Sequence, residues 1–290
     1  MNPTSQSLAS GGDAAEFCAD LVRNENFERY ATTLFVPPDK RRSLLALYAF
    51  NVEISRVRDH ISQPLPGEIR LQWWRDLLAG TESGEAEGNP VAAELLRSFS
   101  EQGLSREPLV GLIDAHVFDV YDDPMPTLEA LESYCHATSS TLLSLGTRIL
   151  ATESDEAWHV ARHAGVAQGI VDVMRLLPVH AARRQMYLPL SWLQEYDVRE
   201  EDVFAGVATP GLHAVIERLR AEAASQLDVA IDLLASLPEI SLAAFLPIVP
   251  VRRALDQIKP EADPFKTAQP SRLGTLWALW RAARSKTFRS

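Results

Sequence analysis

The stretch GIVDVMRLLPVHAARRQMYLP, from Gly169 to Pro189, is the part of the chain whose residue order most resembles a site for chemistry. A helical run is followed by an arginine, a short basic segment and Tyr-Leu-Pro, which is the outline of a magnesium-diphosphate motif. Mg²⁺ takes hard oxygen ligands, and carboxylates three and four residues apart lie on one helix face. Between Leu176 and Tyr187, however, there is no Asp or Glu. The stretch therefore has the frame of a metal site without its ligands.

Arginines are concentrated in this stretch and in a second one, NVEISRVRDH, from Asn51 to His60. A guanidinium group binds phosphate oxygens through paired hydrogen bonds, so one interpretation is a cavity that binds an anion without a metal. The alternative is ordinary helix-surface arginines paired with nearby acids. The five arginines are Arg56, Arg58, Arg175, Arg183 and Arg184.

The bulk composition excludes several classes of protein. The 290 residues are 46% apolar, enough for a sizeable core, and the net charge of -11 argues against a general nucleic-acid binder. Cys18 and Cys135 have no metal-ligand spacing, which favours free thiols in a reducing compartment. There is no secretory signal pattern and no run of 18 apolar residues. We expect a cytoplasmic chain, at most peripheral to the inner membrane.

Apolar residues recur at spacings of three and four almost throughout, which is typical of amphipathic helices. Gly80 is expected to end one helix, Pro90 to begin the next and Thr127 to cap another. No strand-like alternation persists and no linker is visible, so the pattern predicts a single all-α domain. Its parts are a flexible N-terminus (1–14), a helical domain (15–255) and a connector with a basic amphipathic tail (256–290).

Five stretches in a fixed order resemble the squalene/phytoene synthases, which are head-to-head prenyl transferases. The resemblance covers roughly Ala15 to Arg253 and implies the all-helical isoprenoid-synthase fold. The stretches are RYATTLFVPPDKRRSLLALYAFN (Arg29–Asn51), RLQWWRDLL (Arg70–Leu78), LIDAHVFDV (Leu112–Val120), LESYCHATSSTLLSLG (Leu131–Gly146) and AGVAQGIVDVMR…ARRQMYLP (Ala164–Pro189).

The same resemblance implies where metal ligands belong. Family members hold two Asp-rich clusters on facing helices, and these bind the Mg²⁺ ions that ionise an allylic diphosphate. Only Asp59 is acidic among the matching positions, and one carboxylate cannot hold several divalent ions. We therefore predict no metal ligand, no cofactor and no catalytic residue. The matching positions are Ser55, Arg56, Asp59, Leu176, Val179 and His180.

A substitute metal site is conceivable from Glu53, Asp59 and Asp172. Glu53 and Asp59 are six residues apart, however, and should point to different faces of a helix. This argues against a working cluster.

Other side chains near these positions have simpler interpretations. Asp119, Asp122 and Asp123 precede Pro124 at a helix end and are interpreted as a turn. His180 is interpreted as a solvated or capped histidine rather than a general base. Three aromatic residues fall on pocket positions of the family, although single aromatics are more often core: Tyr48, Tyr134 and Tyr187.

Within the family, the departures themselves resemble one branch, the mitochondrial complex I assembly factors and their α-proteobacterial relatives. The strings ALYAFNVEISRVRD, IRLQWWRDLL and GIVDVMRLLPVHAARRQMYLP carry this resemblance. Aspartate clusters are degenerate in that branch too. It implies a pseudoenzyme that helps to build the NADH:quinone oxidoreductase at the membrane, with a protein partner.

Two alternatives remain. The first is an active prenyl transferase that condenses two isoprenyl diphosphates, with Mg²⁺ on unusual ligands. The second is a carrier of an isoprenoid or other lipid in the helical cavity, which the bulky segments TLFVP and STLLSLG would tend to close.

The tail RLGTLWALWRAARSKTFRS is basic and carries two tryptophans. We expect a C-terminal helix that packs these tryptophans on the core. The alternative is a peripheral contact with an anionic membrane or a partner protein.

Overall fold

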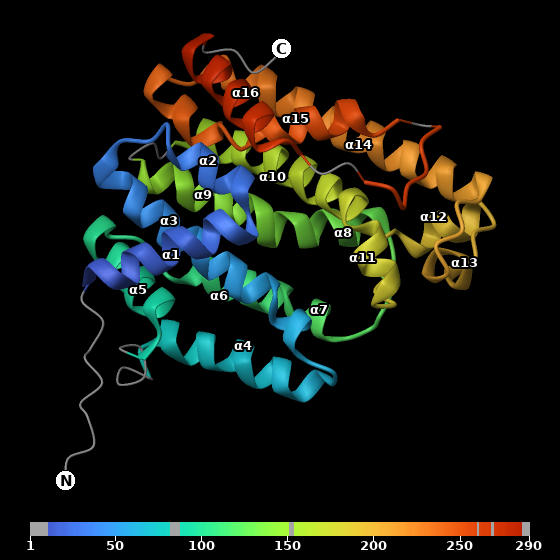
Figure 1. The fold of residues 1–290 in the computed structure, drawn as a ribbon, viewed down its shortest axis with the longest axis horizontal. Helices are drawn as coiled ribbons and strands as arrows, with labels where there is room; N and C mark the ends of the chain where they lie inside the picture. Colours follow the sequence, from blue (N-terminus) through green and yellow to red (C-terminus); the bar gives the residue numbers. More distant parts are fainter. Residues whose placement is uncertain (1–10, 82–87, 151–153, 260, 268–269, 286–290) are drawn as a thin grey trace.

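The computed structural model describes residues 11–81, 88–150, 154–259, 261–267 and 270–285. Every regular element in these ranges is a helix (Figure 1), which confirms the predicted all-α fold. In order they are α1 (Gly11–Glu25), α2 (Phe27–Thr33), α3 (Pro38–Ser55), η1 (Val57–His60), α4 (Pro64–Ala79), α5 (Pro90–Gln102), α6 (Glu107–Ala115), α7 (Val117–Val120), α8 (Leu128–Cys135), η3 (His136–Ser140), α9 (Thr141–Ile149), α10 (Asp155–Arg175), α11 (Leu177–Ala182), α12 (Leu190–Glu195), α13 (Glu200–Phe204), α14 (Pro210–Leu234), η4 (Glu239–Phe245), α15 (Ile248–Gln257) and α16 (Arg272–Ser285).

Local sequence signals set several of these boundaries. The Thr127 side chain accepts a hydrogen bond from the backbone N–H of Ala130, which caps α8 as predicted. Asn89 caps α5 in the same way, and Pro90 follows at the first helical position. Gly80 ends α4 with φ of 81°, a left-handed conformation that favours glycine. These boundaries follow from residues close in sequence.

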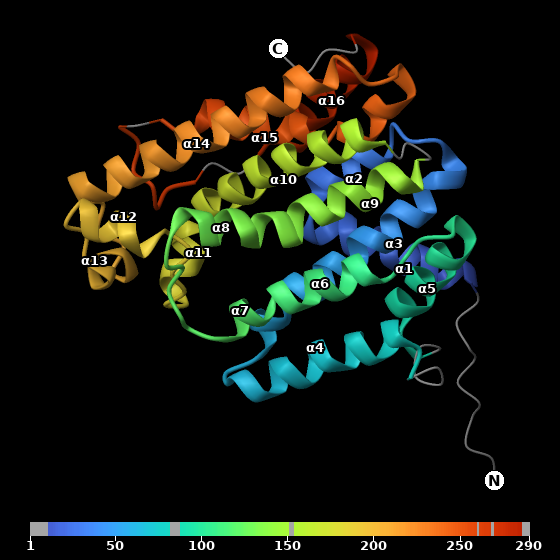
Figure 2. The same ribbon diagram turned by 180° about the vertical axis from the view of Figure 1, so that it is seen from behind.

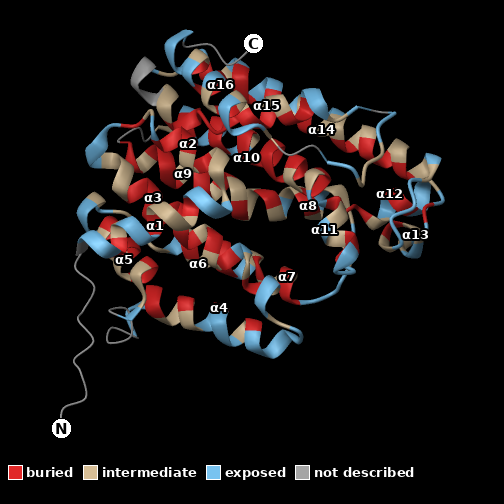
Figure 3. Cartoon of the chain, in the orientation of Figure 1, coloured by how far each residue is buried: buried red, intermediate tan, exposed pale blue. Residues whose placement is uncertain are grey.

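The central pair of the fold is α10 and a second long helix made of α8, η3 and α9 (Figure 2). The middle part of the second helix, η3, is a π-helical segment, which widens the turn. Helices α14, α15 and α16 cover one side of this pair, and α1, α3, α5, α6 and α4 extend on the other (Figure 1). The buried residues lie between these rows (Figure 3), so one hydrophobic core runs through the molecule.

Two glycines let α10 approach the π-helical segment closely. A Cβ at Gly165 would overlap the backbone of Ser140, and a Cβ at Gly169 would overlap the side chain of Cys135. The Ser140 hydroxyl donates a 2.8 Å hydrogen bond to the carbonyl of Arg162 on α10. The two backbones therefore pack directly against each other. Cys135 and the other cysteine are buried free thiols, as the sequence predicts.

The C-terminal helix does not pack its tryptophans on the core, so that prediction is wrong. The buried residues of α16 are small or aliphatic, whereas Trp277 and Trp280 are 60% and 50% exposed. Small residues allow the helix to lie close on α2 and α15, and this turns the indole rings outward. No helix in the described part of the chain is long and apolar enough to span a membrane.

Substitution of Gly165 by alanine tests the close approach of α10. We expect Gly165→Ala to lower the free energy of unfolding by about 2–3 kcal/mol, because the methyl group would overlap backbone atoms that cannot move alone. Gly111→Ala on α6 is the matched control, since no atom lies within 4 Å of the added Cβ. The control should gain about 1 kcal/mol from helix propensity. Urea denaturation measures both, and equal values for the two variants would contradict the packing.

Candidate functional site

A polar cavity of about 240 Å³ lies where the family's two aspartate clusters are expected to face each other. It is bounded by the C-terminal ends of α3 and α10, by α8, and by the short helices α7 and α11. A second cavity, of about 350 Å³, adjoins it, and the two share these lining residues: Asn26, Asn51, Ser55, Asp119, Leu176, His180 and Tyr187. We call these the inner cavity and the adjoining cavity.

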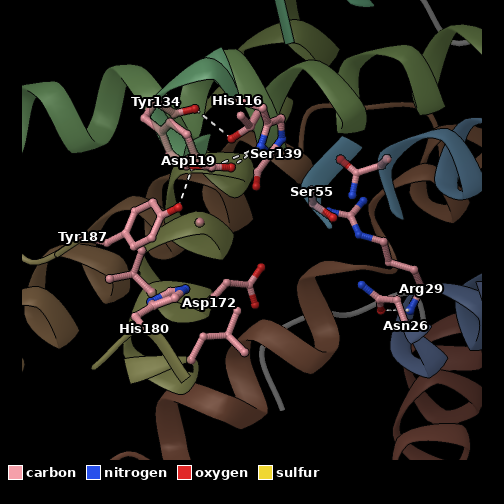
Figure 4. Close-up of a pocket in the computed structure, with 15 residues that line it drawn as sticks. Asn26, Arg29, Ser55, His116, Asp119, Tyr134, Ser139, Asp172, His180 and Tyr187 are labelled. Atoms are coloured by element: carbon pink, nitrogen blue, oxygen red, sulfur yellow. Dashed lines mark hydrogen bonds and ion pairs between the residues drawn. The ribbon is translucent and has the colours of Figure 1, made fainter. Parts of the chain in front are cut away.

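Asp119 is the centre of a buried hydrogen-bond network on one wall of the inner cavity (Figure 4). The hydroxyl of Tyr187 donates to Asp119 Oδ1 at 2.6 Å, and the hydroxyl of Tyr134 lies 2.9 and 3.0 Å from the two carboxylate oxygens. His116 Nδ1 lies 2.5 Å from Oδ2, and Gln185 donates to the Asp119 carbonyl. A carboxylate only 7% exposed is thus fully partnered.

The interpretation of Asp119 as part of a turn is therefore wrong. Proximity to Pro124 suggested a helix end, but α7 ends at Val120 and leaves Asp119 on its inner face. Burial and the negative charge of Asp119 together raise the pKa of Tyr134 and Tyr187 well above their ordinary value. Both tyrosines act as hydrogen-bond donors to the carboxylate.

Arg29 lies on the opposite wall of the inner cavity, beside Asn26 and Ser55 (Figure 4). The Arg29 side chain is 6% exposed, its Nη1 has no hydrogen-bond partner in the described structure, and burial lowers its pKa. Its guanidinium carbon lies 5.3 Å from the ring centre of Tyr48. Tyr48 is buried beneath Arg29 and does not line either cavity, so it supports the wall instead of forming it.

Asp172 is the one acidic residue of α10 that lines the inner cavity. It lies in the last turns of the helix. Burial raises its pKa, although Arg175 and Arg29 act in the opposite direction. Burial therefore makes the carboxylate form, which a metal ion would need, less favourable at Asp172 than it is in water.

The second degenerate cluster is broken by a proline. Pro178 cannot continue α10, so the chain turns at Leu176 and starts the short helix α11. Leu176 and Val179 are 45% and 39% exposed and place aliphatic groups along the cavities where the resemblance puts acids.

His180 is more buried than the sequence suggested. Its ring lies 4.4 Å from that of Tyr187, and its Nδ1 is buried without a hydrogen-bond partner in the described structure. Burial lowers its pKa to about 4, which outweighs the opposite effect of Asp119. His180 is therefore neutral at physiological pH and packs as an aromatic ring, so its interpretation as a solvated or capped histidine is wrong.

The arginines near the two motifs are all paired with acids. Arg56, Arg58 and Arg183 line the adjoining cavity, but Arg175 and Arg184 lie outside both cavities because their partners draw them away. These six ion pairs are partly exposed, and pairs of this kind are individually weak. The pairs are Arg56 with Glu25 and Asp59, Arg58 with Asp122, Arg175 with Glu28, Arg183 with Asp59, and Arg184 with Glu201.

The residues present do not fit a magnesium site. Glu53 binds Arg70 at 2.6 Å, and Asp59 is held by two arginines, so these two acids do not converge with Asp172. Among the residues that the structure describes, no three His, Cys, Asp or Glu side chains are placed to share a metal ion. Mg²⁺ needs several oxygen ligands in near-octahedral geometry, which this donor set does not supply.

The sequence profile of the squalene/phytoene synthase family matches residues 22–278. The chain belongs to the squalene/phytoene synthase family. Complex I assembly factor 6 of Bos taurus is 32% identical over 251 residues, which cover 87% of this chain and 75% of the relative. A 15-cis-phytoene synthase of Synechocystis is 23% identical over 218 residues, 71% of this chain and 64% of that enzyme.

Solved structures of the family share the fold. The squalene synthase HpnC of Alicyclobacillus acidocaldarius superposes with a TM-score of 0.74 at 22% identity, over 88% of this chain and 95% of that one. This confirms the predicted isoprenoid-synthase architecture.

Sequence reasoning did not place three of the charged or titratable residues in the site: Arg29 and His116 were not singled out, and Asp119 was interpreted as a turn. A signal for two of them exists, because His116 and Asp119 are three residues apart within LIDAHVFDV, one of the stretches that carry the family resemblance. Their burial could not be read from the sequence, since it depends on α8 and on the loop that carries Tyr187.

Removal of the Asp119 carboxylate should destabilise the protein strongly. We expect Asp119→Ala to lower the free energy of unfolding by about 3–5 kcal/mol, because buried donors lose their acceptor. Asp122→Ala is the matched control three residues away, where the carboxylate is 64% exposed and pairs with Arg58. Its cost should stay below about 1 kcal/mol. A similar loss for both variants in chemical denaturation would disprove the role of the network.

His180 should make stability depend on pH below neutrality. The folded protein holds the imidazole neutral, with a pKa of about 4, whereas the unfolded chain takes up a proton below about pH 6.5. Stability should therefore fall by about 2 kcal/mol from pH 7.5 to pH 5 on this account alone. Urea denaturation at the two pH values measures this loss, which should be absent in His180→Gln. His159→Gln is the control: His159 is exposed, so this variant should lose as much stability as the wild type. If the free energy of unfolding of His180→Gln falls with pH as much as that of the wild type, His180 does not cause the pH dependence.

Proposed function

We propose that this chain is a non-catalytic member of the squalene/phytoene synthase family that acts as an assembly factor for respiratory complex I, the NADH:quinone oxidoreductase. The observation that carries the proposal is the cavity itself, in which a serine, aliphatic residues and a neutral histidine stand at the positions of metal-binding carboxylates. The relatives named as complex I assembly factor 6 support it, at 31–32% identity over 84–87% of the chain.

The chemistry of the cavity supports the absence of prenyl transfer. Ionisation of an allylic diphosphate requires positive charge that stabilises the departing diphosphate, and family enzymes obtain this charge from Mg²⁺. In this chain the arginines of the adjoining cavity are already neutralised by Glu25, Asp59 and Asp122. A diphosphate would have to compete with these carboxylates and would be repelled by them.

The charged residues of the cavity walls also argue against a role as a lipid carrier. An isoprenoid chain in the inner cavity would contact Arg29, Asp119 and Asp172, and an apolar ligand cannot satisfy such groups. The bulky residues that were expected to close a tunnel, including Leu142 and Leu145, belong to the hydrophobic core. The scaffold is therefore better suited to present surfaces to a protein partner than to enclose a prenyl chain.

We place the protein at the surface of the membrane that holds the complex. The exposed tryptophans of α16 support a peripheral contact, because indole rings favour the boundary between water and lipid. The partner in assembly would then be reached from the membrane surface.

Loss of this chain from its host should abolish most NADH:quinone oxidoreductase activity and deplete the intact complex on blue-native gels. A plasmid copy should restore both, and so should Asp172→Asn, because the proposed function does not use the carboxylate as a metal ligand. Prenyl transfer is tested separately by an enzyme assay. The purified protein should release no pyrophosphate from farnesyl or geranylgeranyl diphosphate in the presence of Mg²⁺ and NADPH, whereas an active synthase, the positive control, should release it. Formation of a C30 or C40 product, or normal complex I in the deletion strain, would overturn the proposal.

A further inference from the structure

The outer face of α16 carries an apolar stripe that no described part of the chain covers. Leu273, Trp277 and Trp280 are 80%, 60% and 50% exposed. Their spacings of four and three residues place them along one side of the helix. Exposed apolar groups gathered on one face mark an interaction surface.

The inner face of the same helix is already used by the fold. Thr275, Ala278, Leu279 and Ala282 are buried against α2 and α15. The helix is therefore apolar on two opposite sides, although only one of them faces the core. Because the inner face anchors α16, the outer stripe is held in place on the edge of the molecule (Figures 1 and 3).

The charge of this helix is opposite to that of the rest of the chain. All 39 acidic residues precede Arg272, whereas the segment from Arg272 to the C-terminus contains five basic residues and no acid. Within the helix, the Arg281 guanidinium lies 5.0 Å from the ring centre of Trp277, and that of Arg284 lies 5.5 Å from Trp280. Each outward tryptophan is thus accompanied by a cation.

We infer that the outer face of α16 docks the protein on an anionic phospholipid surface. Leu273 and the two tryptophans enter the boundary between headgroups and acyl chains, and Arg281 and Arg284 bind lipid phosphates. The charge asymmetry orients the molecule, because an anionic surface repels the acidic body and attracts only this helix. The stripe lies on a helix at the edge of the fold and combines apolar groups with cations, which is the chemistry that an anionic lipid surface binds.

This inference deepens the proposed function by naming the surface that would bring the protein to the membrane. It rests on the proposed function only in one respect, namely that the protein works close to a membrane. Vesicle binding by the purified protein is measured without complex I, so the two proposals can fail separately.

Flotation with liposomes tests the inference. The wild type should bind vesicles of phosphatidylcholine with phosphatidylglycerol, bind poorly to phosphatidylcholine alone, and dissociate as salt is raised. Arg281→Gln with Arg284→Gln should weaken binding about thirtyfold, since each basic residue contributes about fivefold at an anionic surface. Trp277→Ala with Trp280→Ala should also lose binding, while circular dichroism shows that both double variants remain folded.

Trp158→Ala is the matched control. Trp158 is 42% exposed on α10 and lies 5.8 Å from the guanidinium of Arg162, which reproduces a tryptophan–arginine pair away from α16. The control should bind vesicles as the wild type does. The inference is overturned if the wild type fails to bind anionic vesicles, or if the α16 variants bind as well as the control. If those variants block complex I assembly without a vesicle defect, the face binds a protein instead.

Discussion

The close approach of α10 to the π-helical segment is the constraint on which the site depends. Gly165 and Gly169 allow the two helices to touch, and an added Cβ would overlap Ser140 at the first position and Cys135 at the second. This contact fixes α8, and with it Tyr134, at one wall of the inner cavity, and it fixes the end of α10, with Asp172, at another. The cavity is thus a consequence of how two long helices pack, and it persists although the residues of the metal clusters have changed.

Around the cavity, the charged side chains near the two motifs are paired with other groups of the protein. Asp119 is surrounded by hydroxyl and imidazole groups, and the arginines near the two motifs have carboxylate partners. A site that binds diphosphate through metal ions must instead keep its carboxylates free of such partners. The network around Asp119 therefore stabilises the wall as structure, while the unpartnered Nη1 of Arg29 is a local exception. The charged groups around the cavity thus bind one another.

The cavity and the proposed membrane-binding face of α16 lie apart in the fold. The cavity lies between the central helices, whereas the apolar and basic stripe of α16 lies on the outer row formed with α14 and α15 (Figure 1). The packing of α16 on α2 and α15 holds this outer helix in place independently of the cavity. The role in assembly and the docking on a membrane would both use this rigidity.

The helices and their caps could be predicted from the sequence, because apolar periodicity and capping act between residues close in the chain. The family followed from several motifs in a fixed order. The sequence also determined that most acids of the metal clusters are absent, since residue types can be read directly. Three features depend instead on the packing of distant segments: the burial of Asp119, the contact of His180 with Tyr187 and the outward orientation of the α16 tryptophans. Each of these depends on which face of an element meets a distant segment, and periodicity cannot choose between two apolar faces of one helix.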